Sequence, residues 1–367
     1  MNLKSLNKTL CTMVVMALCA GAVNAQEAPK QDAPKPSPVD VSGVLFFDYS
    51  YILENKDKVT NTKKTYGDSF NLNRAYLTAQ KKIDDVWSAR VTLDAGTVEN
   101  SDAFVKNAYV QMAPKFGDVG LKLQGGLVGT PIIGLLDGFT GSRWIYQNYV
   151  DKAKDLTDKD IDVSSADTGL KGELNIVKIV TITGMYSNGD GYKKNTTDQN
   201  TVTKSNYLVV NVTPFSALNV FGYYHWHDTA AKSKENYVSY VGGGAAWSDK
   251  AIKVGASYTM ASGKAANLKE ESTIIEVWAN VNLQQFAGVP VLLIGRYAMG
   301  KYEKDATPNK LKNEGSAIWA GVGYQVNSNV QLAAMYKVDS ITDKNATGAK
   351  TKDLENSTMF VKSEIKF

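Results

Sequence analysis

Long apolar segments are missing from this sequence of 367 residues. No stretch after the first 25 residues approaches the roughly 20 apolar residues that a membrane-spanning helix needs. The uncharged run at residues 9–23 is shorter than that, follows Lys4 and Lys8, and ends at the small-residue sequence Val23-Asn24-Ala25. This arrangement is typical of a secretory signal peptide, so we expect residues 1–25 to be removed. A membrane form of the mature protein would therefore have to be a β-barrel.

Cysteine is nearly absent. Cys11 and Cys19 both lie in the predicted signal peptide, so the mature chain is expected to have none. This excludes disulfides and thiolate metal sites, although an exported protein could have formed disulfides. Loss of Lys4 and Lys8 lowers the formal net charge from +4 to +2, a balance that indicates neither nucleic acid nor acidic lipid as a partner. Residues 26–38 are rich in proline and are expected to form a periplasmic lead-in without a core.

Apolar and polar residues alternate along most of the remaining chain. In VWSARVTLDAG, at residues 86–96, Trp87 and Val91 share one face of an extended chain, while Arg90 and Asp94 share the other. A period of two predicts β-strands, and most of these segments are long enough to cross a bilayer at a tilt of about 45°. The pattern predicts sixteen strands, at about residues 39–52, 69–82, 86–96, 102–113, 119–128, 166–176, 178–187, 204–213, 217–227, 236–247, 251–260, 270–284, 289–302, 314–326, 329–340 and 356–367.

The predicted connections alternate in length. Those after even-numbered strands have five residues or fewer, as at 83–85 and 327–328, whereas those after odd-numbered strands are mostly longer, as at 53–68 and 341–355. Short turns at one end and long loops at the other are typical of outer-membrane barrels, and a soluble β-sandwich has no reason to show them. The sequence thus predicts an all-β fold, a transmembrane antiparallel β-barrel over residues 39–367.

The final segment, STMFVKSEIKF at residues 357–367, separates two environments. Its apolar residues Met359, Val361 and Phe367 alternate with charged residues such as Lys362. We expect lipid on the apolar face and Phe367 at the periplasmic interface. Aromatic residues near predicted strand ends are expected to form the two girdles of a barrel, although aromatics are common in any strand. They are Tyr49, Tyr51, Trp87, Trp226, Trp247, Tyr258, Tyr302 and Phe367.

These features resemble those of a known group. A last strand of alternating apolar residues that ends in phenylalanine is similar to the terminal signature of Gram-negative outer-membrane proteins. Most of the mature chain resembles trimeric porins, particularly the phosphate-selective O/P-like group. The resemblance lies in FNLNRAYLTAQKKIDDVWSARVTLDAG at residues 70–96, followed in order by GGLVGTP, SRWIYQNY, SADTGLKGEL and YSNGDGY.

The resemblance implies a homotrimer in the outer membrane of a Gram-negative bacterium. Its partners would be outer-membrane lipid and the small hydrophilic solutes and ions that diffuse passively through a water-filled channel. An anion-selective or phosphate-selective porin, or a surface-exposed barrel acting as an adhesin or receptor, is the alternative. The ladder of arginines on which the phosphate-selective relatives depend is not visible here, so the sequence favours general diffusion.

Function in so wide a barrel depends on what narrows its channel. The longest predicted connection, residues 129–165, is apolar in its first half and rich in aspartate in its second half. We expect this third external loop to fold into the lumen and form the constriction, as it does in porins; a surface lid or a subunit contact is the alternative. The candidate residues for constriction and selectivity are Arg74, Arg90, Arg143, Arg296, Asp137, Asp151 and Asp155.

Arginine occurs only four times. Alternation places Arg90 and Arg296 in the lumen, and Arg143 lies on the inserted loop. Strict alternation points Arg74 to the same face as Phe70, but a guanidinium facing lipid at mid-bilayer would cost about 2 to 4 kcal/mol. A β-bulge that turns it inward is therefore favoured. Opposite the loop carboxylates these cations would create a transverse field; alternatively, they are solvated lumen residues without selectivity.

Histidine occurs only at His225 and His227, in YHWHD. Their spacing puts both on one face of a strand, where with Asp228 they could hold a metal, although solvated side chains at a strand end are the simpler interpretation. The sequence shows no nucleophile held near a base, as a barrel hydrolase would need. We therefore expect no catalytic site, no metal and no cofactor.

Overall fold

The structure is a computed structural model and describes most of the chain after the lead-in. Contacts divide the chain into two units, residues 1–37 and 38–367, and the described residues all belong to the second. The predicted signal peptide and nearly all of the lead-in lie outside them. No helix in the described part is long and apolar enough to span a membrane. The described ranges are 38–64, 67–96, 103–157, 163–189, 191–192, 203–228, 236–265, 268–306, 309–345 and 347–367.

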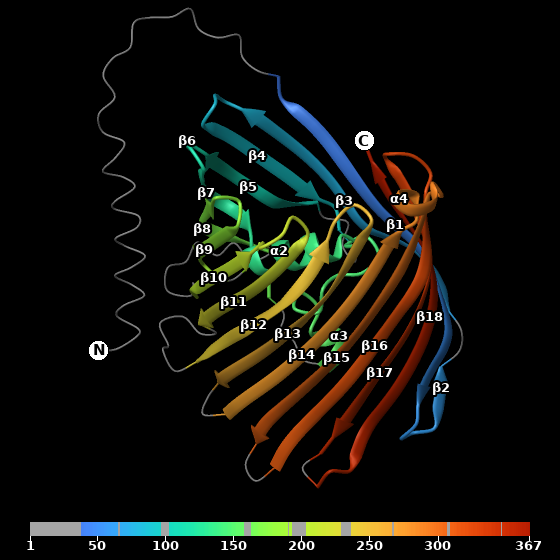
Figure 1. Cartoon of the computed structure of the whole chain (residues 1–367). Helices are drawn as coiled ribbons and strands as arrows, with labels where there is room; N and C mark the ends of the chain where they lie inside the picture. The colour runs from blue at the N-terminus through green and yellow to red at the C-terminus, as the bar shows by residue number, and fades with distance from the viewer. Residues whose placement is uncertain are drawn as a thin grey trace, which may run out of the picture. The chain divides into compact units, whose positions relative to one another are not determined.

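One antiparallel sheet contains every strand of the described residues (Figure 1). The strands are β1 (Asp40–Asp57), β2 (Thr62–Lys64), β3 (Asp68–Lys82), β4 (Trp87–Asp94), β5 (Phe104–Met112), β6 (Lys115–Phe116), β7 (Val119–Gly129), β8 (Ala166–Ile176), β9 (Val180–Ser187), β10 (Ser205–Val212), β11 (Leu218–Asp228), β12 (Tyr237–Ser248), β13 (Ile252–Ala265), β14 (Leu268–Asn282), β15 (Val291–Ala306), β16 (Asn309–Gln325), β17 (Val330–Lys344) and β18 (Lys350–Lys366). The helices are α2 (Pro131–Thr140), α3 (Lys154–Thr157) and α4 (Gln284–Ala287).

The sheet closes on itself. Apart from the short β2 and β6, each strand pairs with the next along the chain, and β1 pairs with both β3 and β18. The short β2 only extends the pairing of β1 with β3, and the short β6 only extends that of β5 with β7. The wall of the barrel therefore consists of sixteen strands of the described chain. At the seam, the Gly43 N–H donates to the Phe367 carbonyl at 2.7 Å and the Phe367 N–H donates back at 3.0 Å. The predicted barrel is confirmed, because the described strands close into a ring through the pairing of β1 with β18.

The outer face of the barrel is apolar. Val91, Tyr258, Ile318 and Tyr336 belong to four of the predicted apolar faces, and each is exposed on the outside of the wall. Exposed apolar side chains on this scale are the pattern expected where the solvent is lipid. Most of the aromatic residues that were predicted to form the two girdles are exposed too, including Trp87, Trp247 and Phe367.

Tyr302 is an exception, and its assignment to the girdle is wrong. Its side chain is only 3% exposed, because it lies on the inward face of β15 with Ala298 and Arg296, which are also buried. Position near a strand end was too weak a signal here, since alternation along β15 already placed this residue with the lumen face.

Several predicted strand ends are also wrong. The loop expected at 341–355 is mostly strand, because β17 runs to Lys344 and β18 begins at Lys350. The loop expected at 53–68 contains the end of β1 and all of β2. Conversely, the connection 283–290 at the opposite end is longer than predicted and contains α4. Alternation fades where the outer face leaves lipid, but backbone pairing needs no apolar side chains and continues beyond that level.

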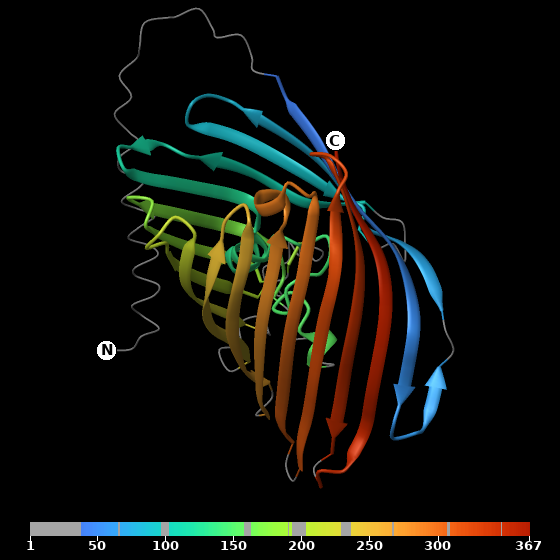
Figure 2. The ribbon, with the colours of Figure 1, turned by 45° about the vertical axis from the view of Figure 1, so that its right-hand side comes forward.

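The wall is uneven in height (Figure 2). β4, β9 and β10 have 8 residues each, whereas β16 and β18 have 17 each. The long strands are neighbours in the ring, so one side of the barrel rises well beyond the other at the external end.

Candidate functional site

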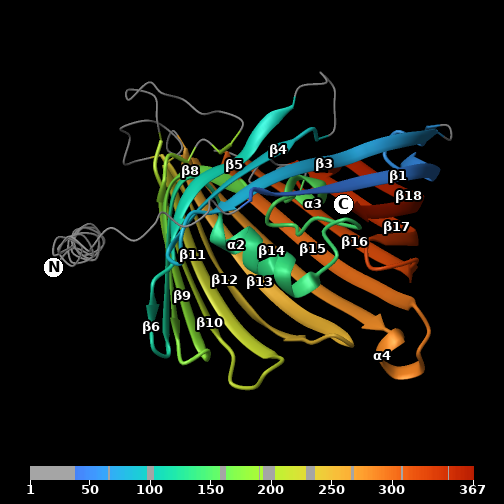
Figure 3. The ribbon, with the colours of Figure 1, turned by 90° about the horizontal axis from the view of Figure 1, so that it is seen from above.

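The long connection between β7 and β8 lies inside the barrel (Figure 3). Pro131 begins α2, where its missing N–H costs no hydrogen bond. Gly141 ends it with a left-handed φ of 62° and donates its N–H to the Asp137 carbonyl at 2.9 Å. The buried side chains of this helix include Ile132, Ile133, Leu136 and Phe139.

Helix α2 packs against the inner wall on the side of β9 to β14. The ring centroids of Phe139 and Phe221 are 5.0 Å apart, and Tyr207, Tyr223 and Trp278 belong to the same buried cluster. An apolar helix that would be unstable in water therefore has an apolar surface to cover. The prediction that the third external loop folds into the lumen and packs its apolar part on the wall is confirmed.

The rest of the loop continues around the wall. Trp144 and Tyr146 pack in one buried cluster with Met335 of β17, and Leu156 packs in another with Ala317 of β16. At Gly315 of β16, an added Cβ would lie 1.9 Å from the Leu156 carbonyl oxygen, so only glycine fits there.

Arg296 and Glu276 fasten the middle of the loop to the wall. The Arg296 guanidinium donates to Glu276 at 2.8 Å and to the Gln147 carbonyl at 2.6 Å. It also lies 4.4 Å and 4.2 Å from the ring centroids of Tyr146 and Tyr149. The same Glu276 oxygen accepts the Tyr149 N–H. The Arg296 side chain has no exposed surface, so it holds the loop in place and does not face water.

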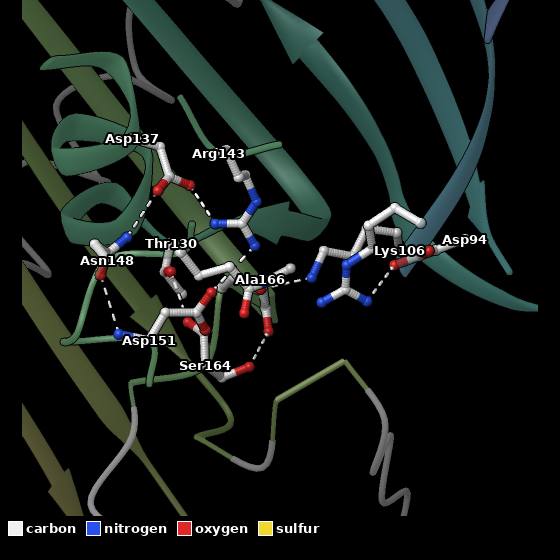
Figure 4. Close-up of polar contacts among 12 residues, drawn as sticks. Asp94, Lys106, Thr130, Asp137, Arg143, Asn148, Asp151, Ser164 and Ala166 are labelled. Atoms are coloured by element: carbon white, nitrogen blue, oxygen red, sulfur yellow. Dashed lines mark hydrogen bonds and ion pairs between the residues drawn. The ribbon is translucent and has the colours of Figure 1, made fainter. Parts of the chain in front are cut away.

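The other face of the loop is charged (Figure 4). Arg143 donates to both Asp137 and Asp151, the second at 3.1 Å, and Asn148 donates to Asp137 at 2.8 Å. Burial opposes the charge of Arg143, but Asp137 and Asp151 outweigh it and hold the pKa of the guanidinium above its ordinary value. Burial raises the pKa of the Asp151 carboxyl, an effect that Arg143 partly offsets.

The wall facing this network carries further charges. Arg74 of β3 donates to Asp94 of β4 at 3.1 Å. Lys106 of β5 donates to the Ser165 hydroxyl at 2.5 Å and lies 3.4 Å from the ring centroid of Tyr192. Lys106 is also within electrostatic range of Arg143 and Asp151, which joins the wall to the loop. We call the six side chains Arg74, Asp94, Lys106, Asp137, Arg143 and Asp151 the charged cluster; it contains three cations and three carboxylates.

Two β-bulges bring cations into this cluster. The pairing of β1 with β3 skips Asn73, so Phe46 faces Arg74 and Phe47 faces Leu72. Arg74 therefore points inward although Leu72 remains exposed outside. A second irregularity, between β4 and β5, skips Lys106 and turns it inward as well. Strict alternation puts Lys106 on the outer face with Val110, and the cost of a cation in lipid was the signal that could have indicated this second bulge.

The remaining candidate residues lie elsewhere. Arg90 donates to Thr92 at 3.2 Å on the inner face of β4, and Asp155 is exposed on α3 within range of Lys337. In the described part of the chain, no hydrogen bond or ion pair joins Arg90 or Asp155 to the charged cluster. Asp94 was not among the candidate residues, because no pattern in the sequence indicated that it pairs with Arg74.

The two histidines lie in the wall away from this cluster. His225 is buried and stacks on Tyr207, with ring centroids 4.0 Å apart. The Ser205 hydroxyl is 3.2 Å from His225 Nε2 and 3.0 Å from His227 Nδ1. Among the described residues, no group of three or more His, Cys, Asp or Glu side chains is placed to hold a metal.

A closed barrel with an apolar exterior, and with a lumen narrowed by a charged loop, defines a channel of the outer membrane. A sequence model of the Gram-negative porins matches residues 12–357, and the chain belongs to that family. It is thus an outer-membrane channel for passive diffusion. A comparison with curated proteins gives no significant match.

Solved structures share the fold at low sequence identity. OmpT of Vibrio cholerae, in a mutant that lacks loop L8, has a TM-score of 0.61 and 15% identity over 90% of this chain and 99% of its own; another OmpT structure is in a trimer form. The anion-selective porin from Comamonas acidovorans has a TM-score of 0.60 and 13% identity over 90% and 99%. OmpF of Salmonella typhi, in complex with daunomycin, has a TM-score of 0.59 and 12% identity over 90% and 97%.

Proposed function

We propose that this channel is a homotrimeric general diffusion porin for small hydrophilic solutes and ions, embedded in outer-membrane lipid. Its constriction would lie between the inserted loop and the wall of β3 to β5, where the charged cluster is found. The observation that carries this proposal is the pairing of charges there: Arg143 contacts Asp137 and Asp151, and Arg74 contacts Asp94. The trimer form of OmpT supports the assembly.

Balanced charges favour weak ion selectivity. Three cations beside three carboxylates give the charged cluster no net charge, whereas an anion-selective or phosphate-selective pore needs cations in excess. Closely apposed opposite charges still create a local field across the opening, which orients polar solutes without excluding either ion. We therefore keep general diffusion as the function and assign no phosphate preference.

A catalytic role has less support. The Ser205 hydroxyl beside the two histidines is the arrangement nearest to a nucleophile with a base, but Ser205 is only 1% exposed and lies within the wall. A substrate would have no access to it without opening the barrel. We propose that the protein transports and does not catalyse.

Single-channel recording in planar bilayers tests the proposal. The purified mature protein should conduct in three equal steps, and in a tenfold salt gradient its reversal potential should stay close to zero. Deletion of residues 131–160 should raise the conductance, because the inserted loop then no longer occupies the lumen. A silent wild-type barrel, or a reversal potential near the limit for one ion, would contradict the proposal.

A further inference from the structure

A second external connection also reaches the charged cluster. It joins β9 to β10, and its Tyr192 lies against the wall at β5. The ring centroid of Tyr192 is 3.4 Å from Lys106 Nζ and 5.4 Å from the ring centroid of Phe104. Tyr192 is also within electrostatic range of Arg74 on β3 and Asp94 on β4. An aromatic side chain from outside the inserted loop therefore borders the proposed constriction.

The backbone just before Tyr192 is held against the inserted loop. The Gly189 N–H donates to the carboxylate of Asp167, near the start of β8, at 2.5 Å. Gly189 and Gly191 have left-handed φ values of 90° and 73°, which glycine adopts without strain. An added Cβ at Gly191 would lie only 2.6 Å from the hydroxyl oxygen of Ser164, at the end of the inserted loop. The position of Tyr192 is thus fixed by β8 and the inserted loop.

The Tyr192 ring covers a charge that would otherwise face the channel. A β-bulge turns Lys106 inward, yet this residue is only 6% exposed. Its ammonium lies over the Tyr192 ring and donates to the Ser165 hydroxyl at 2.5 Å. A cation over the face of an aromatic ring is attracted to it, so the ring keeps the ammonium in this place.

The exposed part of the charged cluster is balanced only while Lys106 is covered. The Asp94 side chain has no exposed surface. The members of the cluster whose side chains keep some exposure are two cations and two carboxylates, namely Arg74, Arg143, Asp137 and Asp151. Exposure of Lys106 would add a third cation without adding a carboxylate. Because lumen charges set ion preference, the pore would then favour anions.

We propose that Tyr192 is a specificity-determining residue of the pore. Its ring holds the Lys106 ammonium away from passing ions and narrows the opening beside β5. This inference rests on the proposed diffusion function and assigns the weak ion selectivity to one side chain. In the alternative role, Tyr192 only packs the connection onto the wall, and its loss would leave the ion preference as it is.

Reversal-potential measurements on Y192A in planar bilayers test this role. In a potassium chloride gradient from about 0.01 M to about 0.1 M the Debye length is about 10 Å or more. A unit charge in water about 7 Å from an ion changes the local concentration of that ion about threefold. The anion-to-cation permeability ratio of Y192A should therefore rise about threefold, and its conductance should also rise. The double variant Y192A/K106Q should lose the shift in ion preference, because no uncovered ammonium remains.

The matched control is Y186A. Tyr186 also lies near a lysine, with its ring centroid 5.9 Å from Lys204 Nζ, but its side chain is exposed on the outside of the wall. The permeability ratio and the conductance of Y186A should therefore equal those of the wild type.

Thiol modification gives a second, independent measurement. The mature chain is expected to contain no cysteine, so Y192C would carry a single thiol. Trimethylammonium-ethyl methanethiosulfonate couples to a thiol through a disulfide, and it should lower the conductance of Y192C but not that of Y186C. Heat-induced mobility shift on gels identifies variants that have not folded, and Y192C serves if Y192A fails.

A permeability ratio of Y192A equal to that of the wild type would overturn the proposal. So would a shift that K106Q does not reverse, or a Y192C channel whose conductance the thiol reagent leaves unchanged. These outcomes are distinct from failure of the proposed function, which would show in the wild type itself as a silent barrel or as strong selectivity for one ion.

Discussion

Replacement of Arg296 by methionine should detach the middle of the inserted loop. The variant R296M keeps the length of the side chain but leaves Glu276, which is 1% exposed, without its cation. Removing one partner of a buried ion pair costs about 3 to 5 kcal/mol. The hydrogen bond to the Gln147 carbonyl is lost as well. Since about 1.4 kcal/mol is a factor of ten, the population of detached loop should rise by about 100-fold or more.

Hydrogen exchange of the amides of residues 142–151 measures this population, because exchange there needs the loop to leave the wall. The strand amides of the barrel serve as the internal reference and should exchange as in the wild type. The double variant R296M/E276Q should recover much of the loss, since the amide leaves no buried charge without a partner. Equal loop exchange in R296M and wild type would refute the view that Arg296 fastens the loop.

The other predictions concern the charged cluster and the seat of the loop. R143Q should shift the reversal potential in the direction of cation selectivity, because Asp137 and Asp151 then lack their common partner. D137N should shift it in the direction of anion selectivity. Both shifts should become smaller at about 1 M salt, which screens the charges. G315A should increase open-channel noise, since the new methyl meets the Leu156 carbonyl at 1.9 Å, whereas G295A, whose nearest neighbour is at 3.8 Å, should behave as wild type. Quiet currents in G315A would show that the loop does not need this glycine.

Much of the barrel could be predicted because each strand separates two solvents. The alternation along β13 or β16 arises because one face contacts lipid and the other contacts water or the inserted loop. It continues over the whole part of the strand that crosses the hydrocarbon layer. Above that height both faces are polar, so the external ends of β1 and β18 carried no pattern although their backbones remain paired. The alternation of apolar and polar residues therefore predicted which part of each strand lies in the membrane, but it did not predict where the strands end.

The site could be predicted only in part, because two irregularities in strand pairing decide which cations face the lumen. For Arg74 the cost of a guanidinium in lipid indicated the correct side. The same cost applies to Lys106, but the argument was made only for the arginines, and Lys106 was therefore missed although the pairing of β4 with β5 skips it. Arg296 was placed on the correct face, but its burial depends on a loop more than a hundred residues away in sequence, which alternation within one strand does not report.

The inner wall of β10, β11 and β14 also departs from the usual polar lumen because the inserted loop covers it. Tyr207, Phe221 and Trp278 face inward and are buried, although an inward face in a wide barrel normally contacts water. These aromatic residues are stable there only because α2 covers them, and α2 is stable inside the barrel only because they are present. The loop and this part of the wall therefore depend on each other. The pore that we propose therefore lies on the opposite side of the lumen, beside β3 to β5, where the charged cluster is found.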